Sequence, residues 1–179
     1  MTHKEKYELA KWNWIVKEHP CAFKKDPVSF ERGFKELCKF PRISGAPSLE
    51  KTIANYMKYV GHQCSKITTS GRYVAGKKTI GTSSSFGTTQ SANTGHYIPG
   101  GSTKGVADLI ATVYGLKWDI EVKFSKGDKQ RDTQIEYQKT VENAGGFYSI
   151  VKTFQDFIEK YEEFIELPRV KLMREFNID

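Results

Sequence analysis

Residues 105–124 read GVADLIATVYGLKWDIEVKF, two apolar segments that meet at a Tyr-Gly pair at positions 114–115. A two-residue turn at this pair is typical of an antiparallel β-hairpin, and it places Asp108 directly opposite Glu121. A turn shifted by one residue places Asp108 opposite Lys123 instead. In both registers the side chains of Asp108, Glu121 and Lys123 project from the same face, because side chains alternate along a strand.

The other face of this predicted hairpin is wholly apolar. Its members are Ala107, Leu109, Ala111, Val113, Trp118, Ile120, Val122 and Phe124. The segments that follow predict an α/β fold: a helix over about 134–144 stopped by a Gly-Gly pair, a strand over 147–152, and a second helix. The apolar positions of that last helix are Phe154, Phe157, Ile158, Tyr161 and Phe164.

The N-terminal part of the chain is predicted to be helical. Apolar residues recur at helical spacing in two stretches, so we interpret residues 1–45 as a helical extension packed on the main domain. Ser48 is expected to cap a third helix, and a short strand follows over 63–68. The buried stripe of that helix comprises Leu49, Ile53, Met57 and Val60. One α/β domain is therefore expected over residues 46–166, followed by a C-terminal tail over 167–179.

Length and composition restrict the class of protein. With 179 residues, 38% of them hydrophobic and 27% charged, the chain suits one globular domain rather than several, a coiled coil or a disordered tail. No apolar run reaches the ~18 residues that a membrane span requires. The first 20 residues, rich in Lys, Glu and His, do not resemble a secretory signal, so we expect a cytoplasmic protein. Three cysteines without a Cys-x-x-Cys spacing argue against a disulfide framework and a zinc site.

Positive charge is concentrated in the middle of the chain. The net charge is +7, and residues 51–107 carry seven basic and no acidic side chains. A carboxylate-free stretch of this length predicts a surface for a polyanion, most commonly nucleic acid; a basic face kept for solubility is the alternative. From Gly81 to Lys104, 15 of 24 residues are Gly, Ser or Thr, so we expect residues 70–104 to form a mobile basic loop.

The polar face of the hairpin suggests metal chemistry. Two carboxylates, Asp108 and Glu121, together with the backbone carbonyl of Val122, offer the hard oxygen ligands that a hydrated Mg²⁺ or Mn²⁺ prefers. The neighbouring Lys123 can orient or deprotonate a metal-bound water and offset charge on a phosphate, which is the chemistry of phosphodiester hydrolysis. The alternative is an ordinary amphipathic strand on which Glu121 and Lys123 are exposed.

The order of several short segments strengthens the metal interpretation. These are SLEK at 48–51, KITTSGR at 66–72, KGVADL at 104–109, IEVK at 120–123, DTQ at 132–134 and AGGFY at 144–148. Their succession, over about residues 48–162, resembles the PD-(D/E)xK nuclease superfamily and, within it, the virus-type replication-repair nuclease (VRR-NUC) family. Two features depart from the family pattern: Ala107 stands where the superfamily name has Pro, and the segment 74–104 is long. Residues 1–45 have no counterpart in it.

The resemblance implies an α/β fold with a PD-(D/E)xK, restriction-endonuclease-like core. Such a core has a central mixed β-sheet flanked by helices, to which this chain adds the N-terminal helical extension. The resemblance also implies a Mg²⁺- or Mn²⁺-dependent DNA endonuclease, in which Asp108 and Glu121 bind the metal and Lys123 is the catalytic lysine.

Two more site residues follow from the same resemblance. Glu50 would complete the site or hold a second metal, and Gln134 would be oriented towards the ligands. Helical periodicity supports that orientation independently, because Gln134 shares a face with Tyr137 and Val141. The alternatives are a carboxylate favoured by the helix dipole for Glu50 and a solvent-facing helix start for Gln134.

DNA is the partner that the resemblance implies. The residues expected to contact its phosphates are Lys66, Arg72, Lys77, Lys78 and Lys104, and for Lys66 and Arg72 a purely solvated role is the alternative. We expect a homodimer that acts on branched or Holliday-junction-like DNA in phage or viral replication, repair or recombination, in the host-cell cytoplasm if the protein is viral. The rival interpretations are a non-catalytic DNA-binding or virion structural protein on a nuclease fold and a sequence-specific restriction-type nuclease.

Overall fold

The computed structural model describes residues 1–19, 32–34, 36–67, 72–83, 88–93, 95–98, 103–125 and 127–176 of the chain. A four-stranded sheet lies at its centre, in the order β1 (Gln63–Lys66), β6 (Leu109–Val113), β7 (Leu116–Val122) and β8 (Phe147–Val151). β1, β6 and β7 pair antiparallel, whereas β8 runs parallel to β7. The predicted α/β class with a mixed sheet is therefore confirmed.

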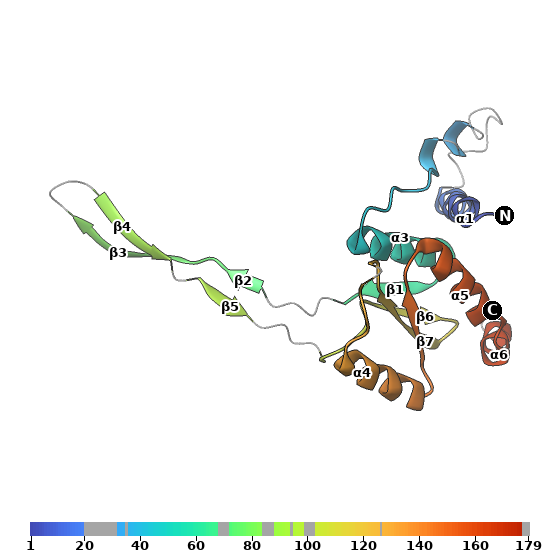
Figure 1. Ribbon diagram of the computed structural model, residues 1–179. Helices are drawn as coiled ribbons and strands as arrows, with labels where there is room; N and C mark the ends of the chain where they lie inside the picture. Colours follow the sequence, from blue (N-terminus) through green and yellow to red (C-terminus); the bar gives the residue numbers. More distant parts are fainter. Residues whose placement is uncertain are drawn as a thin grey trace.

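Helices cover both faces of the sheet (Figure 1). α3 (Ala46–Tyr59) and α5 (Phe154–Glu166) pack on the apolar face of the sheet. α1 (His3–Glu18) packs on these two helices, and α6 (Pro168–Phe176) packs on α5. α4 (Asp132–Asn143) lies on the opposite face, where its polar side chains meet those of β7. The three layers leave the ends of the strands open for a site.

The register of the central hairpin is the one that the Tyr-Gly turn predicts. Leu109 pairs with Ile120, so the preceding residue, Asp108, lies opposite Glu121. The turn residues at positions 114 and 115 have φ of 49° and 79°, the left-handed values that a two-residue hairpin turn favours at both positions. The register shifted by one residue is therefore wrong.

The apolar face of the hairpin forms the core, with one exception to the prediction. Its buried members are Ala107, Leu109, Ala111, Val113, Trp118, Ile120 and Val122. Phe124 is 42% exposed, because β7 ends two residues before it and the chain leaves the sheet. The five apolar positions predicted for α5 are all buried, and the ring of Phe164 stacks on Trp118 with centroids 4.7 Å apart.

The N-terminal helix is part of the same core. Tyr7 of α1 is buried, and its ring contacts Tyr56 of α3 and Phe154 of α5. Helical residues at 32–34 and 36–37 agree with the second predicted helix, the rest of which lies outside the described residues. Within the extension predicted over residues 1–45, α1 thus packs on the α/β domain through aromatic contacts.

α3 begins earlier than predicted. Its N-cap is Gly45, and Ser48 lies inside the first turn, where its Oγ accepts the backbone N–H groups of Ser44 and Gly45 at 2.9 and 3.0 Å. Ser48 as N-cap is therefore wrong, because Pro47 suits the first turn of a helix and the helix includes it. The stripe of Leu49, Ile53 and Met57 is buried as predicted, and Val60 is half-buried beyond the helix end.

Much of the segment expected to be an irregular loop forms paired strands instead. β2 (Arg72–Val74) pairs with β5 (His96–Ile98), and β3 (Lys77–Ser83) pairs with β4 (Thr88–Asn93), both antiparallel. The low apolar content of the segment argues against a core, but backbone pairing needs none, and Thr, Val, Ile and Tyr favour strands. We call these four strands the β-ribbon; Figure 1 shows it extending away from the sheet. Its mobility stays a prediction.

Residues 168–176 of the segment expected to be a C-terminal tail form a helix, α6. α6 buries Val170 completely and packs Met173 against the core. Arg169 donates to the carbonyl oxygen of Gly145 at 2.9 Å, which ties α6 to the end of α4. The α/β domain therefore includes α6. Within the described part of the chain, no helix is long and apolar enough to cross a membrane.

Candidate active site

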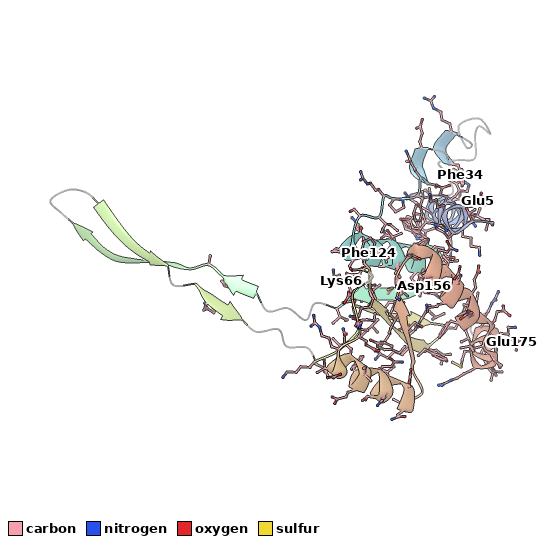
Figure 2. The ribbon with its side chains drawn as sticks, in the orientation of Figure 1. Glu5, Phe34, Lys66, Phe124, Asp156 and Glu175 are labelled. Atoms are coloured by element: carbon pink, nitrogen blue, oxygen red, sulfur yellow. The ribbon has the colours of Figure 1, made fainter. Side chains whose placement is uncertain are left out.

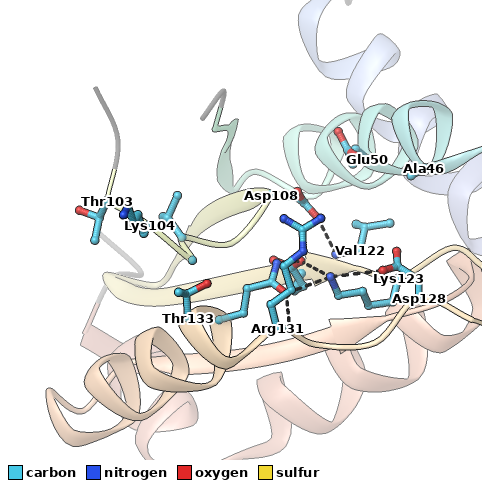
Figure 3. Close-up of a pocket in the computed structure, with 14 residues that line it drawn as sticks. Ala46, Glu50, Thr103, Lys104, Asp108, Val122, Lys123, Asp128, Arg131 and Thr133 are labelled. Atoms are coloured by element: carbon cyan, nitrogen blue, oxygen red, sulfur yellow. Dashed lines mark hydrogen bonds and ion pairs between the residues drawn. The ribbon is translucent and has the colours of Figure 1, made fainter. Parts of the chain in front are cut away.

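A cavity of about 610 Å³ opens at the end of the sheet where β6 begins and β7 ends (Figure 3). The first turns of α3 and α4 contribute to its walls. Its charged lining consists of the carboxylates of Glu50, Asp108, Glu121 and Asp128 and the cations of Lys104, Lys123 and Arg131. All five residues predicted to be catalytic, which are Glu50, Asp108, Glu121, Lys123 and Gln134, line this one cavity.

Asp108 is held in place by the backbone of two neighbouring strands. Its Oδ2 accepts the N–H of Val122 at 2.9 Å, and its own carbonyl oxygen accepts the N–H of Ile67 at 2.8 Å. The first contact fixes the carboxylate beside the end of β7, next to Glu121. The predicted role of Val122 as a carbonyl ligand stays a prediction; its N–H is what orients Asp108.

Glu121 is buried with one of its two oxygens unpaired. Its side chain is 2% exposed, and its Oε1 accepts from Lys123 Nζ and Gln134 Nε2. Its Oε2 is buried and has no hydrogen-bond partner among the described residues. Burial raises the pKa of Glu121 and the charge of Asp108 adds to the rise, while the contacts with Lys123 and Gln134 oppose it. An ionised carboxylate in this position calls for a further cation.

Lys123 is also buried, contrary to the alternative of a solvated strand residue. It is 6% exposed, and its Nζ lies 2.8 Å from Glu121 Oε1, 3.1 Å from Gln134 Oε1 and 3.6 Å from Asp128 Oδ1. Its backbone N–H donates to the carbonyl of Val151 in β8 at 2.8 Å. These contacts hold one ammonium group at a fixed point in the cavity wall.

Gln134 connects the helix to the strand residues. Its Oε1 accepts from Lys123 Nζ and from the N–H of Arg131, the latter at 3.0 Å, and its Nε2 donates to Glu121. Gln134 therefore faces the site and not the solvent. The contact with Arg131 closes the first turn of α4, so the same amide both caps the helix and orients two charged side chains.

Glu50 approaches the site from α3 and meets a lysine of β1. It is 7% exposed, and Lys66 Nζ lies 2.5 Å from its Oε2 as an ion pair outside hydrogen-bond geometry. That oxygen is buried and, within the described ranges, has no hydrogen-bond partner. Lys66 thus contacts Glu50, and its contact with DNA stays a prediction. No group of three or more His, Cys, Asp or Glu side chains in the described residues is close enough to hold a metal without other ligands.

Gly105 brings the segment before Asp108 against α4. It has φ of 78°, and a Cβ at this position would lie 2.1 Å from the carbonyl oxygen of Thr133. Only glycine allows so close an approach of the two backbones. The contact fixes the distance between the segment that carries Asp108 and the helix that carries Gln134.

A second polar cluster holds α4 on the sheet. Asp119 of β7 is fully buried; its Oδ2 accepts from Lys117 Nζ at 2.9 Å and from the hydroxyl of Tyr137 at 3.0 Å. Burial raises the pKa of Tyr137, and the acceptor Asp119 raises it further. The sequence analysis missed this cluster, although Tyr137 was expected to face inward. It anchors the helix that carries Gln134.

Two residues of the cavity carry no signal in the sequence. Asp128 follows β7 in an irregular segment, and Arg131 precedes α4; neither belongs to a periodic pattern. Of the residues predicted to contact phosphate, Lys104 lines the cavity, whereas Arg72, Lys77 and Lys78 belong to the β-ribbon. The structure thus divides the predicted basic residues between the cavity and the β-ribbon.

The donors present fit a hydrated Mg²⁺ or Mn²⁺. Mg²⁺ is commonly bound by one or two carboxylates while water and substrate phosphate complete its octahedron, so Asp108 and the unpaired Oε2 of Glu121 form a sufficient protein contribution. Glu50 lies on another wall of the same cavity.

Comparisons of the chain with protein-family models, with curated proteins and with solved structures gave no match.

Proposed function

We propose that this protein is a Mg²⁺- or Mn²⁺-dependent endonuclease that hydrolyses phosphodiester bonds of DNA in the cavity around Glu121. The observation that carries the proposal is the buried, unpaired Oε2 of Glu121 beside Asp108, with the ammonium of Lys123 on the other oxygen of the same carboxylate. A carboxylate pair next to a fixed ammonium matches the needs of metal-assisted attack of water on a phosphate.

Each residue then has a distinct task. Asp108 and Glu121 would hold the metal, which supplies Lewis acidity and lowers the pKa of its bound water when present. Lys123 orients the attacking water and offsets the charge that develops on the phosphate oxygens. Gln134 is a positioning residue, because it binds Glu121 and Lys123 at once. Glu50, paired with Lys66, offers a further carboxylate on another wall of the cavity.

We also propose that the core is of the PD-(D/E)xK type and is related to the VRR-NUC family. The support lies in the order of the elements: a helix with Glu50, a strand, Asp108 before β6, Glu121 and Lys123 at the end of β7, and Gln134 in the first turn of a helix. These five residues lie in or directly beside α3, β6, β7 and α4, and they meet in one cavity.

The substrate we propose is branched or junction-like DNA, cut by a homodimer during phage or viral replication, repair or recombination. The seven basic and no acidic side chains of residues 51–107 support a nucleic-acid substrate. A junction presents two strands at symmetric positions, and a two-fold dimer presents two such cavities.

Cleavage assays with matched carboxylate variants test the proposal. Labelled duplex, flap and four-way DNAs are incubated with the protein and Mg²⁺, Mn²⁺ or EDTA. We expect cleavage with either metal, none with EDTA, and a loss of at least about 10²-fold in Asp108→Asn and Glu121→Gln. Glu163→Gln, which changes an exposed carboxylate of α5, is the control and should cut at the wild-type rate.

Two results would count against the proposal. Cleavage that survives EDTA removes the metal from the mechanism. Tight DNA binding without cleavage under any metal condition favours the rival interpretation, a DNA-binding protein on a nuclease fold.

A further inference from the structure

The two ladders of the β-ribbon follow one another along the chain in the same pairing register. Arg72 pairs with Ile98 in the first ladder and Lys77 with Asn93 in the second, and the offset between the paired positions is the same in both. A bulge between Thr79 and Gly81 shifts the register by one residue, after which pairing continues to the end of β3. From position 72 to 83 the ribbon is about 40 Å long at ~3.3 Å per residue.

The described residues that precede and follow the β-ribbon in the chain both reach the candidate site. The chain leaves the sheet at Lys66, the last residue of β1, whose Nζ contacts Glu50 in the cavity. It returns through residues 103–106, which line the same cavity, and enters β6 directly after Asp108. Figure 2 shows Lys66 on the side of the sheet from which the β-ribbon extends. A polymer with one bond in the cavity is therefore bound on the side of the sheet from which the β-ribbon extends.

The chemistry of the β-ribbon changes along its length. Its proximal half contains Arg72, Lys77 and Lys78. Its distal half, residues 79–83 and 88–91, contains no charged residue and consists mostly of Thr, Ser and Gln. Lysines and arginines bind phosphates, and short hydroxyl and amide side chains can hydrogen-bond to base edges.

We propose that the β-ribbon lies in the major groove of a DNA duplex next to the bond in the cavity. The inference rests on the proposed function, because it assumes DNA in that cavity. The major groove is about 12 Å wide and admits a two-stranded β-ribbon, with the basic proximal half next to the phosphate backbone. A ribbon of about 40 Å spans about 12 base pairs at ~3.4 Å each, so the protein requires roughly one turn of duplex on one side of the cut.

A second copy of this chain is the competing occupant, because the edges of a two-stranded ribbon can pair with another strand. Charge argues against it. Two copies of the β-ribbon would bring the same basic residues together with no carboxylate of residues 51–107 between them, whereas DNA supplies the opposite charge.

Chemical protection on bound DNA tests the inference. The full chain is bound to a flap DNA with a duplex arm, in Ca²⁺ to prevent cutting, and methylation of guanine N7 in the major groove is measured. We expect protected guanines within about 12 base pairs of the branch. A shortened chain, without residues 76–94 and with Ala75→Asn, places an Asn-Gly turn between the paired Val74 and His96 and should lose that protection.

Affinity gives a second and independent readout. Wild-type affinity should rise as the duplex arm grows from 6 to about 12 base pairs and then level off, and the shortened chain should bind the longer arms at least about tenfold more weakly. Lys77→Gln with Lys78→Gln should lower the salt slope by about 2. The matched control, Lys139→Gln with Lys152→Gln on exposed surface of α4 and after β8, should leave the slope unchanged.

Several outcomes would overturn the inference. Unprotected guanine N7 in a tight wild-type complex, or equal affinity of the shortened chain for long arms, removes the β-ribbon from the groove. A wild-type dimer that becomes a monomer on shortening, with unchanged DNA binding, assigns the β-ribbon to a second copy. Hydrolysis of bis(4-nitrophenyl) phosphate with Mn²⁺ needs no duplex, so its absence counts against the proposed activity and not against the β-ribbon.

Discussion

Nζ of Lys123 lies 2.8 Å from Oε1 of Glu121, and both side chains are buried. A buried ion pair loses the hydration of both charges, and its attraction offsets that loss only when the other polar atoms are satisfied. Oε2 of Glu121 has no such hydrogen-bond partner in the part of the chain described. The unpaired oxygen makes the arrangement costly in the protein alone. The proposed cation at Oε2 would offset that cost, so we expect metal binding and folding to be linked here.

Stability without metal should separate the two carboxylates. Asp108→Asn keeps an oxygen that can accept the Val122 N–H and removes the charge beside Glu121, so the free energy of unfolding should stay unchanged or rise. Glu121→Gln leaves Lys123 buried with the more distant Asp128 as its remaining ion-pair partner among the described residues, and should cost about 3 kcal/mol. Urea unfolding in EDTA measures both. Equal destabilisation by the two variants would contradict the geometry.

Metal affinity should fall in both variants despite their opposite effects on stability. Calorimetric titration of Mn²⁺ into the wild type, Asp108→Asn and Glu121→Gln measures this. Unchanged affinity in both variants would remove the metal from this pair of residues.

Lys123 should matter for rate and not for DNA affinity. Lys123→Met keeps the length of the side chain but removes the ammonium beside Glu121. Without this ammonium the negative charge that develops on the phosphate is no longer offset, so cleavage should slow by at least about 10²-fold. Because Lys123 is buried, the affinity for a branched DNA should hardly change. Single-turnover cleavage and anisotropy with the same labelled substrate give the two numbers. Equal cleavage rates would assign Lys123 a structural role only.

The sequence was sufficient for the parts of the fold that follow from local rules. A Tyr-Gly pair allows positive φ at both turn positions, and this sets the register that places Asp108 opposite Glu121. The burial of α5 follows in the same way from a helical apolar period. The β-ribbon does not, because its pairing depends on backbone hydrogen bonds and leaves no apolar pattern to read.

The candidate site was predictable in its members and not in its contacts. Glu121 and Lys123 are two residues apart in the sequence, and this spacing alone is typical of an amphipathic strand on which both side chains are exposed. They are buried because α4 covers that face, and α4 is held there by Asp119 and Tyr137. The position of Gln134 between the two charges depends on this long-range packing, which no spacing in the sequence reports.

Gly105 should be more sensitive to substitution than a glycine of similar conformation elsewhere. Gly105→Ala adds a Cβ 2.1 Å from the carbonyl oxygen of Thr133 as well as left-handed strain at φ of 78°. Gly61 has φ of 86° with nothing within 4 Å of an added Cβ, so Gly61→Ala isolates the strain, about 1 kcal/mol. We expect Gly105→Ala to lose clearly more unfolding free energy and also to lose cleavage. Equal losses in the two variants would show that the approach to α4 is unimportant.

His62 should make stability depend on pH well below neutrality. Burial lowers its pKa to about 4 from an ordinary value of 6.5, and its Nε2 lies 3.0 Å from the hydroxyl of Tyr161. Between these two pH values the unfolded chain binds more protons than the folded one, so the free energy of unfolding contributed by His62 falls as the pH drops from 6.5 to 4. Urea unfolding at several pH values, compared with His62→Gln, isolates it. Parallel pH curves for the two proteins would contradict the assignment.

The fold limits which residues can form the interface of the proposed homodimer. Trp12 and the aromatic stripe of α5 do not offer a homodimer interface, because they are buried within the chain. The apolar surface left for a partner includes Leu172 and Phe176 of α6, which are 53% and 75% exposed and lie one helical turn apart.

If these two residues form the interface, light scattering should give twice 20.4 kDa for the wild type and a single-chain mass for the double variant Leu172→Arg with Phe176→Arg. Glu175→Gln, on the same helix, should remain a dimer. A wild-type mass of one chain that junction DNA does not change would refute the homodimer, and the protein would then cut the strands of a junction one at a time.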